Sequence, residues 1–406
     1  MAKEVASSRR CIYLDNNGTS PIYREVAEEM QPFLFDHFGN PSSSHAYGRV
    51  PKQALDLARE RVANLLGAKA SQVYFTGSGT ESNNWAIRGA LEYGSQKRPK
   101  RSDFLPHVVT SNIEHPAVAE ALAKYKREGL CDYTEVAVDT KSGVLSVEAV
   151  EAAFRTGETV LCTVMHSNNE IGSLQPIAEI AKIAHAHGAL MHTDGAQSVG
   201  KVDVDVEALG VDLCTVVGHK FGASKGVAAL YCSLDSREFP SLLHGGGQEN
   251  GMRPGTENVL LISGIGKASE IALLEGKEIR RNMLKTRNLL RGRLVEALGS
   301  HGIDYRINGP AEEANSLPNT LSISIPAVQA QEILADLSES VAASAGAACH
   351  SGGFHVSGVL KAIGLDDAHA RGTLRLSTGR LTTEEEIERA SDLIVEAVLR
   401  ATSSSG

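Results

Sequence analysis

Two charged side chains follow apolar runs that are typical of buried β-strands. Lys220 comes just after Leu213–Val217, and Asp194 comes just after Ala189–His192. A lysine amine beside a buried strand can have a lowered pKa and form a Schiff base with a carbonyl group. A carboxylate in such a position can keep a pyridinium nitrogen protonated, so the two residues together fit pyridoxal 5'-phosphate (PLP). Either residue alone could equally belong to an ion pair.

A glycine-rich turn adds a possible phosphate site. The segment TGSGTES (76–82) follows the apolar run Gln72–Phe75 and contains Gly79 and Thr80. The glycine permits close backbone approach, and the threonine would begin a helix whose free N–H groups suit a phosphate. An ordinary helix cap is the alternative explanation. The spacing matches neither a dinucleotide motif nor a nucleoside triphosphate motif. Together with the lysine and the aspartate, this turn predicts PLP as the cofactor.

The histidines could offer metal ligands instead. His115, His166, His192 and His219 lie in different contexts, and none has a second ligand at the short spacing that zinc sites use. We therefore expect no metal site, and we expect most of these histidines to be hydrogen-bonded within the fold. His115 differs, because it would begin a helix just after an apolar run, where its imidazole could stack on a planar cofactor.

A cysteine and an arginine nearer the carboxyl terminus complete the candidate set. Cys349 lies in SAGAACHSGGFHVSG (344–358), a run of small residues that indicates a mobile loop able to carry a thiol to a site. The other five cysteines have the context of small core residues. Arg375 lies in an otherwise apolar strand, so its guanidinium requires a carboxylate. That carboxylate could belong to a substrate or to an internal salt bridge.

The elements that must position these residues form a regular pattern. Seven short apolar runs alternate with helical patterns, which predicts an α/β fold with a largely parallel sheet covered on both faces. The runs are Gln72–Phe75, His107–Thr110, Tyr133–Val138, Val160–Val164, Ala189–His192, Leu213–Val217 and Val227–Cys232. Five of them lead into the polar motifs TGSGTES, TSNIEHP, MHSNNEIG, HTDGAQ and GHK. Because ligands bind outside the carboxyl ends of such strands, we expect one site there.

The rest of the chain predicts long helices and a smaller α+β unit. A helical pattern from about Asn258 to Leu298 contains Gly264 and Gly266, where we expect a bend or a break. Other predicted elements are helices at Ala46–Leu66 and Pro176–His187, strands at Asn319–Ile325 and Leu374–Ser377, and a last helix from Thr383.

Composition excludes several classes of function. The formal net charge of −9 argues against a nucleic-acid partner. No apolar run approaches the roughly 20 residues that span a bilayer, so we expect no membrane association. The amino terminus carries Glu4 and no apolar segment, so we expect no secretory signal. The six cysteines form no CxxC pair, which is typical of reduced thiols in a cytoplasmic protein.

These motifs resemble, nearly end to end, those of the NifS-like cysteine desulfurases and selenocysteine lyases, PLP enzymes of the class V aminotransferase group. The resemblance begins at YLDNNGTSP (13–21) and FGNPSSSHAYGR (38–49), includes the five motifs above, and continues through GGGQENGMRPGTEN to LRLSTGRLTTEEEIE. It implies an aspartate-aminotransferase-like large domain (residues 22–265) and a small domain (1–21 and 266–406) that carries Cys349. It also implies a homodimer.

The family pattern implies a role for each matching residue. Lys220 binds the cofactor covalently and later moves the Cα proton of the substrate, and Cys349 attacks the sulfur or selenium atom. Around the cofactor, the resemblance places His115 against the ring, Asp194 at the pyridinium nitrogen, Gln197 at the ring hydroxyl, and Thr80, His219 and, across the dimer, Thr256 at the phosphate. It places Asn40, Asn169 and Arg375 at the substrate carboxylate, with Asn169 also beside the cofactor.

The implied reaction converts L-cysteine or L-selenocysteine to L-alanine and passes sulfur or selenium to an acceptor, possibly a protein. Val217 replaces a serine that is usual in desulfurases, and the sequence AACHS around Cys349 is similar to that of selenocysteine lyases. These features favour the lyase, although the distance from Cys349 to the next helix matches the desulfurases. Another PLP reaction such as transamination, a metal-dependent hydrolase and a non-catalytic scaffold remain as alternatives.

Overall fold

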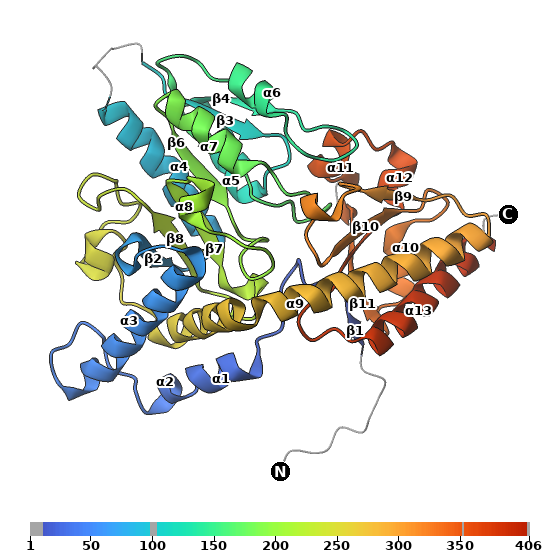
Figure 1. Cartoon of the computed structure of the whole chain (residues 1–406), viewed down its shortest axis with the longest axis horizontal. Helices are drawn as coiled ribbons and strands as arrows, with labels where there is room; N and C mark the ends of the chain where they lie inside the picture. The colour runs from blue at the N-terminus through green and yellow to red at the C-terminus, as the bar shows by residue number, and fades with distance from the viewer. Residues whose placement is uncertain (1–10, 98–103, 351–352, 404–406) are drawn as a thin grey trace.

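The computed structural model describes residues 11–97, 104–350 and 353–403. Its centre is a seven-stranded sheet in the order β2-β8-β7-β6-β5-β3-β4 (Figure 1). The strands are β2 Val73–Thr76, β3 His107–Ser111, β4 Asp132–Val136, β5 Thr159–Thr163, β6 Leu190–Asp194, β7 Leu213–Val217 and β8 Ala228–Cys232. Strand β8 runs antiparallel to β2 and β7, whereas the pairs from β7 to β4 are parallel. The predicted strands and the largely parallel sheet are confirmed, with strand ends shifted by up to two residues.

Helices bury both faces of this sheet, which explains why its inner strands are buried along almost their whole length, whereas the edge strand β4 is only partly buried. On one face Leu161 packs in a core with Trp85 and Leu122. On the other face its neighbour Cys162 packs in a core with Ile180, because successive side chains along a strand point to opposite faces. The first face is covered by α4 Gly79–Gln96 and α5 Pro116–Arg127, and the second by α3 Ala46–Leu66, α6 Val147–Ala152, α7 Ile177–Ala186, α8 Val206–Leu209 and part of α9.

The long helix α9 is continuous from Val259 to Ser300, so the predicted bend or break at its glycines is wrong. A Cβ at Gly264 would lie 2.7 Å from Sδ of Met30 at the end of α1 (Arg24–Met30), and one at Gly266 would lie 2.6 Å from Cα of Ala58 in α3. Both contacts are too short for a side chain. The glycines therefore allow neighbouring helices to approach α9, and helical packing outweighs their low helix propensity.

A smaller unit with its own core lies at the carboxyl-terminal end of α9 (Figure 1). Its antiparallel sheet has the order β12-β15-β10-β9. The strands are β9 Arg306–Asn308, β10 Thr320–Ser324, β12 Ser344–Ala345 and β15 Thr373–Ser377, and the helices are α10 Ala330–Asp336, α11 Gly358–Ala362, α12 Asp367–Arg371 and α13 Glu384–Ser403. The amino-terminal strand β1 (Ile12–Tyr13) pairs in parallel with β11 (Val341–Ala342). The predicted strands and last helix of this unit are confirmed.

The backbone around Cys349 differs from the expected loop. Strands β13 (Ala347–His350) and β14 (Gly353–Val356) form an antiparallel pair in which Cys349 lies opposite Phe354. Ladder hydrogen bonds between the two strands satisfy backbone groups that an open loop would expose to water. Residues 351–352 lie outside the described residues.

The division of the chain into residues 22–265 and residues 1–21 plus 266–406 remains a proposal. The core around Leu290 and Leu374 lies entirely in the second part and supports this division. The core that covers one face of the central sheet crosses the boundary, because it also contains Ile271 of α9 and Leu360 of α11, and α9 itself runs across residue 265. A short helix α2 (Pro32–Phe35) lies in the first of these parts. Within the described ranges, no helix combines the length and the apolar character that crossing a membrane requires.

Candidate active site

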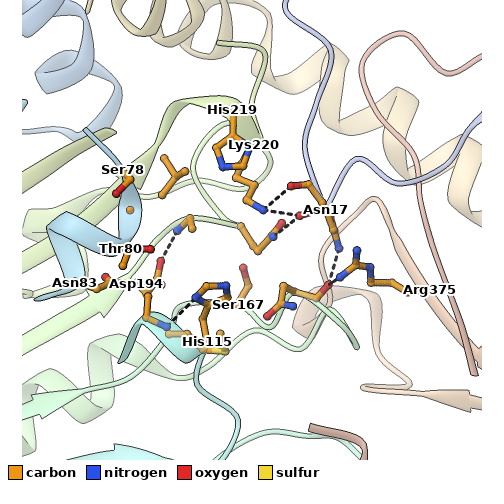
Figure 2. Close-up of a pocket in the computed structure, with 18 residues that line it drawn as sticks. Asn17, Ser78, Thr80, Asn83, His115, Ser167, Asp194, His219, Lys220 and Arg375 are labelled. Atoms are coloured by element: carbon orange, nitrogen blue, oxygen red, sulfur yellow. Dashed lines mark hydrogen bonds between the residues drawn. The ribbon is translucent and has the colours of Figure 1, made fainter. Parts of the chain in front are cut away.

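A cavity of about 400 Å³ lies at the carboxyl ends of the central strands. Residues from all five strand-end motifs line it, as the expectation of a single site requires (Figure 2). Two further contributions come from distant parts of the chain, namely Asn17 and Gly18 near the amino terminus and Arg375 on β15. In Figure 2, Ser78 and Thr80 lie on the side of the cavity opposite Arg375.

The first side of the cavity is the amino-terminal end of α4. Ser78 caps this helix, and its hydroxyl accepts a hydrogen bond from the Glu81 backbone N–H at 3.2 Å. A Cβ at Gly79 would lie 2.5 Å from Cγ2 of Val217, so only glycine fits against this valine. Burial, followed by nearby lysines, lowers the pKa of His219 to about 4. Helix N–H groups, Thr80 and a neutral imidazole thus form a cup that suits a phosphate.

The acidic group of the cavity is held from two sides. Asp194 is buried, and its Oδ2 accepts a hydrogen bond from Asn83 Nδ2 at 2.7 Å. Its Oδ1 accepts one from the Ala196 backbone N–H at 2.9 Å. These two donors fix the orientation of the carboxyl group, which can then face a ring nitrogen in the cavity. Asn83 was missed by the sequence analysis, although it lies one helical turn beyond Gly79 and so could have been found.

His115 caps α5 at the mouth of the cavity. Its Nδ1 accepts a hydrogen bond from the Ala117 backbone N–H at 3.1 Å, which leaves the proton of a neutral ring on Nε2. Desolvation lowers the pKa of His115, and Lys220 adds to this effect while Asp194 opposes it. The ring is therefore neutral and carries an N–H group near the cavity at neutral pH.

The amine of Lys220 faces the amino-terminal segment. Lys220 ends the short turn Gly218–Lys220 after β7, and its Nζ donates to the backbone carbonyl oxygens of Asn17 and Gly18, both at 2.8 Å (Figure 2). Burial, followed by the charge of Arg375, lowers the pKa of Lys220 to about 8. A substantial share of this amine is therefore neutral near physiological pH and can react as a nucleophile or a base.

Arg375 both lines the cavity and belongs to an internal salt bridge. Its Nη2 lies 2.7 Å from Oδ1 of Asp15 and 2.8 Å from Oγ of Ser344. Its Nη1 donates to the Asn169 backbone carbonyl at 3.4 Å, whereas its buried Nε has no partner among the described residues. Of the two partners expected for this guanidinium, the structure shows the internal one. One N–H group of Nη1 stays available for a second carboxylate.

Most residues predicted for the site line this cavity, and two of those whose side chains the structure describes do not. Those that line it are Gly79, Thr80, His115, Asn169, Asp194, Gln197, His219, Lys220 and Arg375. The two that do not are Asn40 and Thr256, which are exposed on loops outside it. The backbone of Cys349 lies in β13, and its side chain lies outside the described part of the structure. The Oδ1 atom of Asn40 accepts a local hydrogen bond from the Ser42 backbone N–H at 2.9 Å.

The structure adds residues that the sequence analysis did not select. The main ones are Asn17 and Lys201, which hydrogen-bond each other across 184 residues of sequence. No local motif marks such a contact. Of the other histidines, His192 is hydrogen-bonded to Thr163 and Thr215, as expected for a structural histidine.

The fold and the residues of the cavity agree with the class V aminotransferase group that the sequence motifs resemble. Comparisons with known proteins identify the same group. A family model described as aminotransferase class-V matches residues 12–390, and the chain belongs to that family. The chain is 38% identical over 397 residues to the cysteine desulfurase IscS of Methanosarcina thermophila, covering 98% of this chain and 94% of that protein.

Solved structures agree with this assignment. A NifS-like protein has a TM-score of 0.85 and 34% identity, covering 96% of this chain and all of that one (100%). A protein titled SspA in complex with cysteine has a TM-score of 0.74 and 34% identity, covering 91% of this chain and 99% of that one.

Proposed function

We propose that this chain is a PLP-dependent cysteine desulfurase. The observation that carries this proposal is one cavity that combines the Lys220 amine, the Asp194 carboxylate and the phosphate cup at α4. The names of similar proteins support cysteine as a substrate. Transamination on the same fold would not require Cys349, so the thiol test below also separates these two reactions.

The residues present fit the parts of PLP. The α4 amino terminus, Thr80 and His219 would hold the phosphate, Asp194 the ring nitrogen, Gln197 the ring oxygen, and Lys220 the aldehyde carbon. When bound, the cofactor draws electrons away from the substrate Cα, which makes the bond from Cβ to sulfur or selenium breakable. His115 would lie against the ring and present its Nε2 proton toward the reacting groups.

The chain's own groups would then bind the substrate and move its proton. Lys220, with its pKa near 8, can accept the Cα proton at neutral pH and return it to the product. Arg375 can bind the substrate carboxylate through the N–H group of Nη1 that Asp15, Ser344 and the Asn169 carbonyl leave free. Asn169, next to Arg375, would orient the same carboxylate.

Cys349 would remove the sulfur as a persulfide. It lies five residues after Ser344, whose hydroxyl contacts Arg375 at 2.8 Å. Five extended residues span at most about 17 Å, so the hairpin that carries the thiol begins beside the substrate-binding arginine. The thiolate would attack sulfur, and the carbon skeleton would leave as alanine.

Selenocysteine lyase is the second candidate, and Val217 favours it. This residue, where desulfurases usually have serine, lines the cavity and packs against Gly79, so one hydroxyl contact to the phosphate is missing. The names of the similar proteins do not support selenium in particular. The preference for selenocysteine therefore stays a prediction.

Alanine release from L-cysteine and from L-selenocysteine, measured side by side in wild type and Cys349→Ala, tests both candidates. A selenol is more acidic than a thiol and selenide leaves more easily, so selenium can depart without a protein thiol. We expect Cys349→Ala nearly to abolish release from cysteine and to keep a substantial fraction from selenocysteine. Cys232→Ala, which alters a buried thiol on β8, is the matched control. Unchanged release from cysteine in Cys349→Ala would refute the desulfurase proposal.

We further propose a homodimer in the cytoplasm that passes sulfur to an acceptor protein. Large apolar side chains are exposed at Phe35 (80%), Phe38 (70%) and Tyr47 (63%), which is typical of a protein contact surface. Thr256 is exposed as well, as a residue that completes a partner's phosphate site must be. The described cysteines outside the hairpin are free thiols, which suits a reducing compartment.

A further inference from the structure

A second lysine lies behind the cavity without an acidic partner. Lys201 is 3% exposed, and its Nζ donates to Oε1 of Gln197 at 2.7 Å and to Oδ1 of Asn17 at 2.9 Å. Within the part of the chain that the structure describes, no carboxylate forms an ion pair with this amine. A buried lysine is costly unless its N–H groups are satisfied, so its position calls for a role.

The hydrogen bonds of Lys201 match those of a neutral amine. Burial, followed by the charges of Lys220 and Arg375, lowers the pKa of Lys201 well below its usual value. A neutral amine has two N–H groups, and Lys201 donates two hydrogen bonds, both to side-chain amide oxygens. The amine therefore acts as a fixed double donor to the side-chain oxygens of Gln197 and Asn17.

These bonds decide which end of the Gln197 amide faces the cavity. The oxygen and nitrogen ends of an amide have nearly the same shape, so their hydrogen-bond partners determine the orientation. Lys201 occupies Oε1, and Nε2 donates one N–H to the Asn17 backbone carbonyl at 2.9 Å. The second N–H of Nε2 remains, and Gln197 lines the cavity.

The side-chain amide of Asn17 is held in one orientation by its other hydrogen bonds. Its Oδ1 accepts from Lys201 and also from Asn319 Nδ2 at 3.0 Å. Its Nδ2 donates to Oγ1 of Thr320 at 2.8 Å and to the Asn169 carbonyl at 3.1 Å. Every hydrogen-bonding position of the Asn17 amide is thus occupied, so the second acceptor of Lys201 is fixed by the smaller unit.

We propose that Lys201 is a positioning residue that holds the Gln197 amide with its N–H end toward the cofactor. The inference rests on the proposed function, because the acceptor of that N–H is the anionic ring oxygen of PLP. Without Lys201 only the bond from Nε2 to the Asn17 carbonyl would hold this orientation, and an amide that turns over would present its oxygen to an oxygen anion, which repels it. The ring oxygen would then be stabilised in its protonated form, and the cofactor would be bound more weakly.

A double-mutant cycle on the holoenzyme tests this role. The variants are Lys201→Met, which has a similar length but no N–H, Gln197→Leu, and both together, with Lys182→Met on the exposed surface of α7 as control. The readouts are the PLP dissociation constant, the visible spectrum of bound PLP and the melting temperature of the apoprotein. We expect Lys201→Met to weaken PLP binding about tenfold, the loss of one hydrogen bond to a charged group. The yellow band should lose intensity to a band at shorter wavelength.

In the Gln197→Leu background, Lys201→Met should raise the PLP dissociation constant by less than about twofold, because no amide remains to be oriented. An equal effect in both backgrounds would overturn the proposal, as would a folded Lys201→Met variant with the wild-type spectrum and affinity. If Lys201→Met does not fold, Lys201→Gln, which keeps an N–H donor, should retain the yellow band, and its loss would overturn the proposal too. A wild-type protein that binds no PLP would instead refute the proposed function.

Discussion

The two walls of the cavity are built in different ways. One wall consists of strand ends of the central sheet and holds Thr80, Asp194 and Lys220. The other consists of the amino-terminal segment and β15, and its central contact joins Asp15 to Arg375 across 360 residues of sequence. The first wall is part of a sheet buried on both faces, whereas the second depends on how two distant segments meet.

This difference separates two tasks. Cofactor chemistry requires groups fixed relative to one another, and adjacent strand ends of one sheet supply that rigidity. In the proposed reaction, the substrate and the Cys349 thiol would approach the cofactor from the other wall, to which the smaller unit contributes Arg375. The carbonyl oxygens of Asn17 and Gly18 link the two, because Lys220 donates to both.

The largest effect should come from the sheet wall. Lys220→Ala should lower alanine release by about 10³-fold or more and remove the adduct that borohydride traps, because the covalent link and the base are lost together. Lys225→Ala, an exposed lysine on the same loop, is the control. Peptide mapping of the reduced wild-type protein checks the assignment, and an adduct on any other lysine contradicts it.

The same lysine predicts a pH dependence for loading the cofactor. Its pKa of about 8 means that the reactive neutral amine grows about tenfold per pH unit below 8 and levels off above it. The rate at which apoprotein forms the yellow complex should follow this curve. A rise that continues unchanged to pH 10 would mean that the amine titrates like an ordinary lysine.

A smaller effect is expected from the second wall. Arg375→Lys should raise KM for cysteine about ten- to hundredfold with little change in melting temperature, because lysine cannot replace a planar, bidentate donor. Arg380→Lys is the control, since Arg380 also forms ion pairs but does not line the cavity. Unchanged kinetics would remove Arg375 from the substrate site, and a large drop in melting temperature would show that its bond to Asp15 is mainly structural.

The same contrast explains what could be predicted from the sequence. Strands buried on both faces give continuous apolar runs, so the sheet, its polar strand ends and Lys220 were predictable. The glycines of α9 were misinterpreted because their reason is contact with Met30 and Ala58, which no local pattern reveals. Asn17 and Lys201 were missed because their mutual hydrogen bond forms only when segments 184 residues apart are brought together.

The smallest expected effect concerns Glu114, beside the sheet wall, and it is measured as a change in protein stability. Its stem is partly exposed, but its carboxyl group points inward, where Oε1 accepts from the Met165 backbone N–H at 2.9 Å and from Ser111 Oγ at 2.5 Å. Burial raises the pKa of Glu114 to about 8, against its ordinary value of 4.5, and Asp194 adds to this while the hydrogen bonds oppose it.

The raised pKa of Glu114 determines the direction in which the stability of the protein changes with pH. Between pH 4.5 and about 8 the folded protein holds a proton that the unfolded chain has lost, so stability falls as pH rises through this window and is flat above it. Glu114→Gln keeps the shape and cannot ionise. The unfolding free energy of the Glu114→Gln apoprotein, relative to that of wild type, should therefore increase by about 2 kcal/mol from pH 5 to pH 9. Each unit of pKa difference between the folded and unfolded states corresponds to roughly 1.4 kcal/mol, and relaxation of the folded protein around the ionised carboxylate reduces the total. Glu120→Gln on the exposed face of α5 should show no such trend. A difference between Glu114→Gln and wild type that does not change with pH would mean that Glu114 is ionised in the folded protein, and that the sheet wall tolerates a second negative charge beside Asp194.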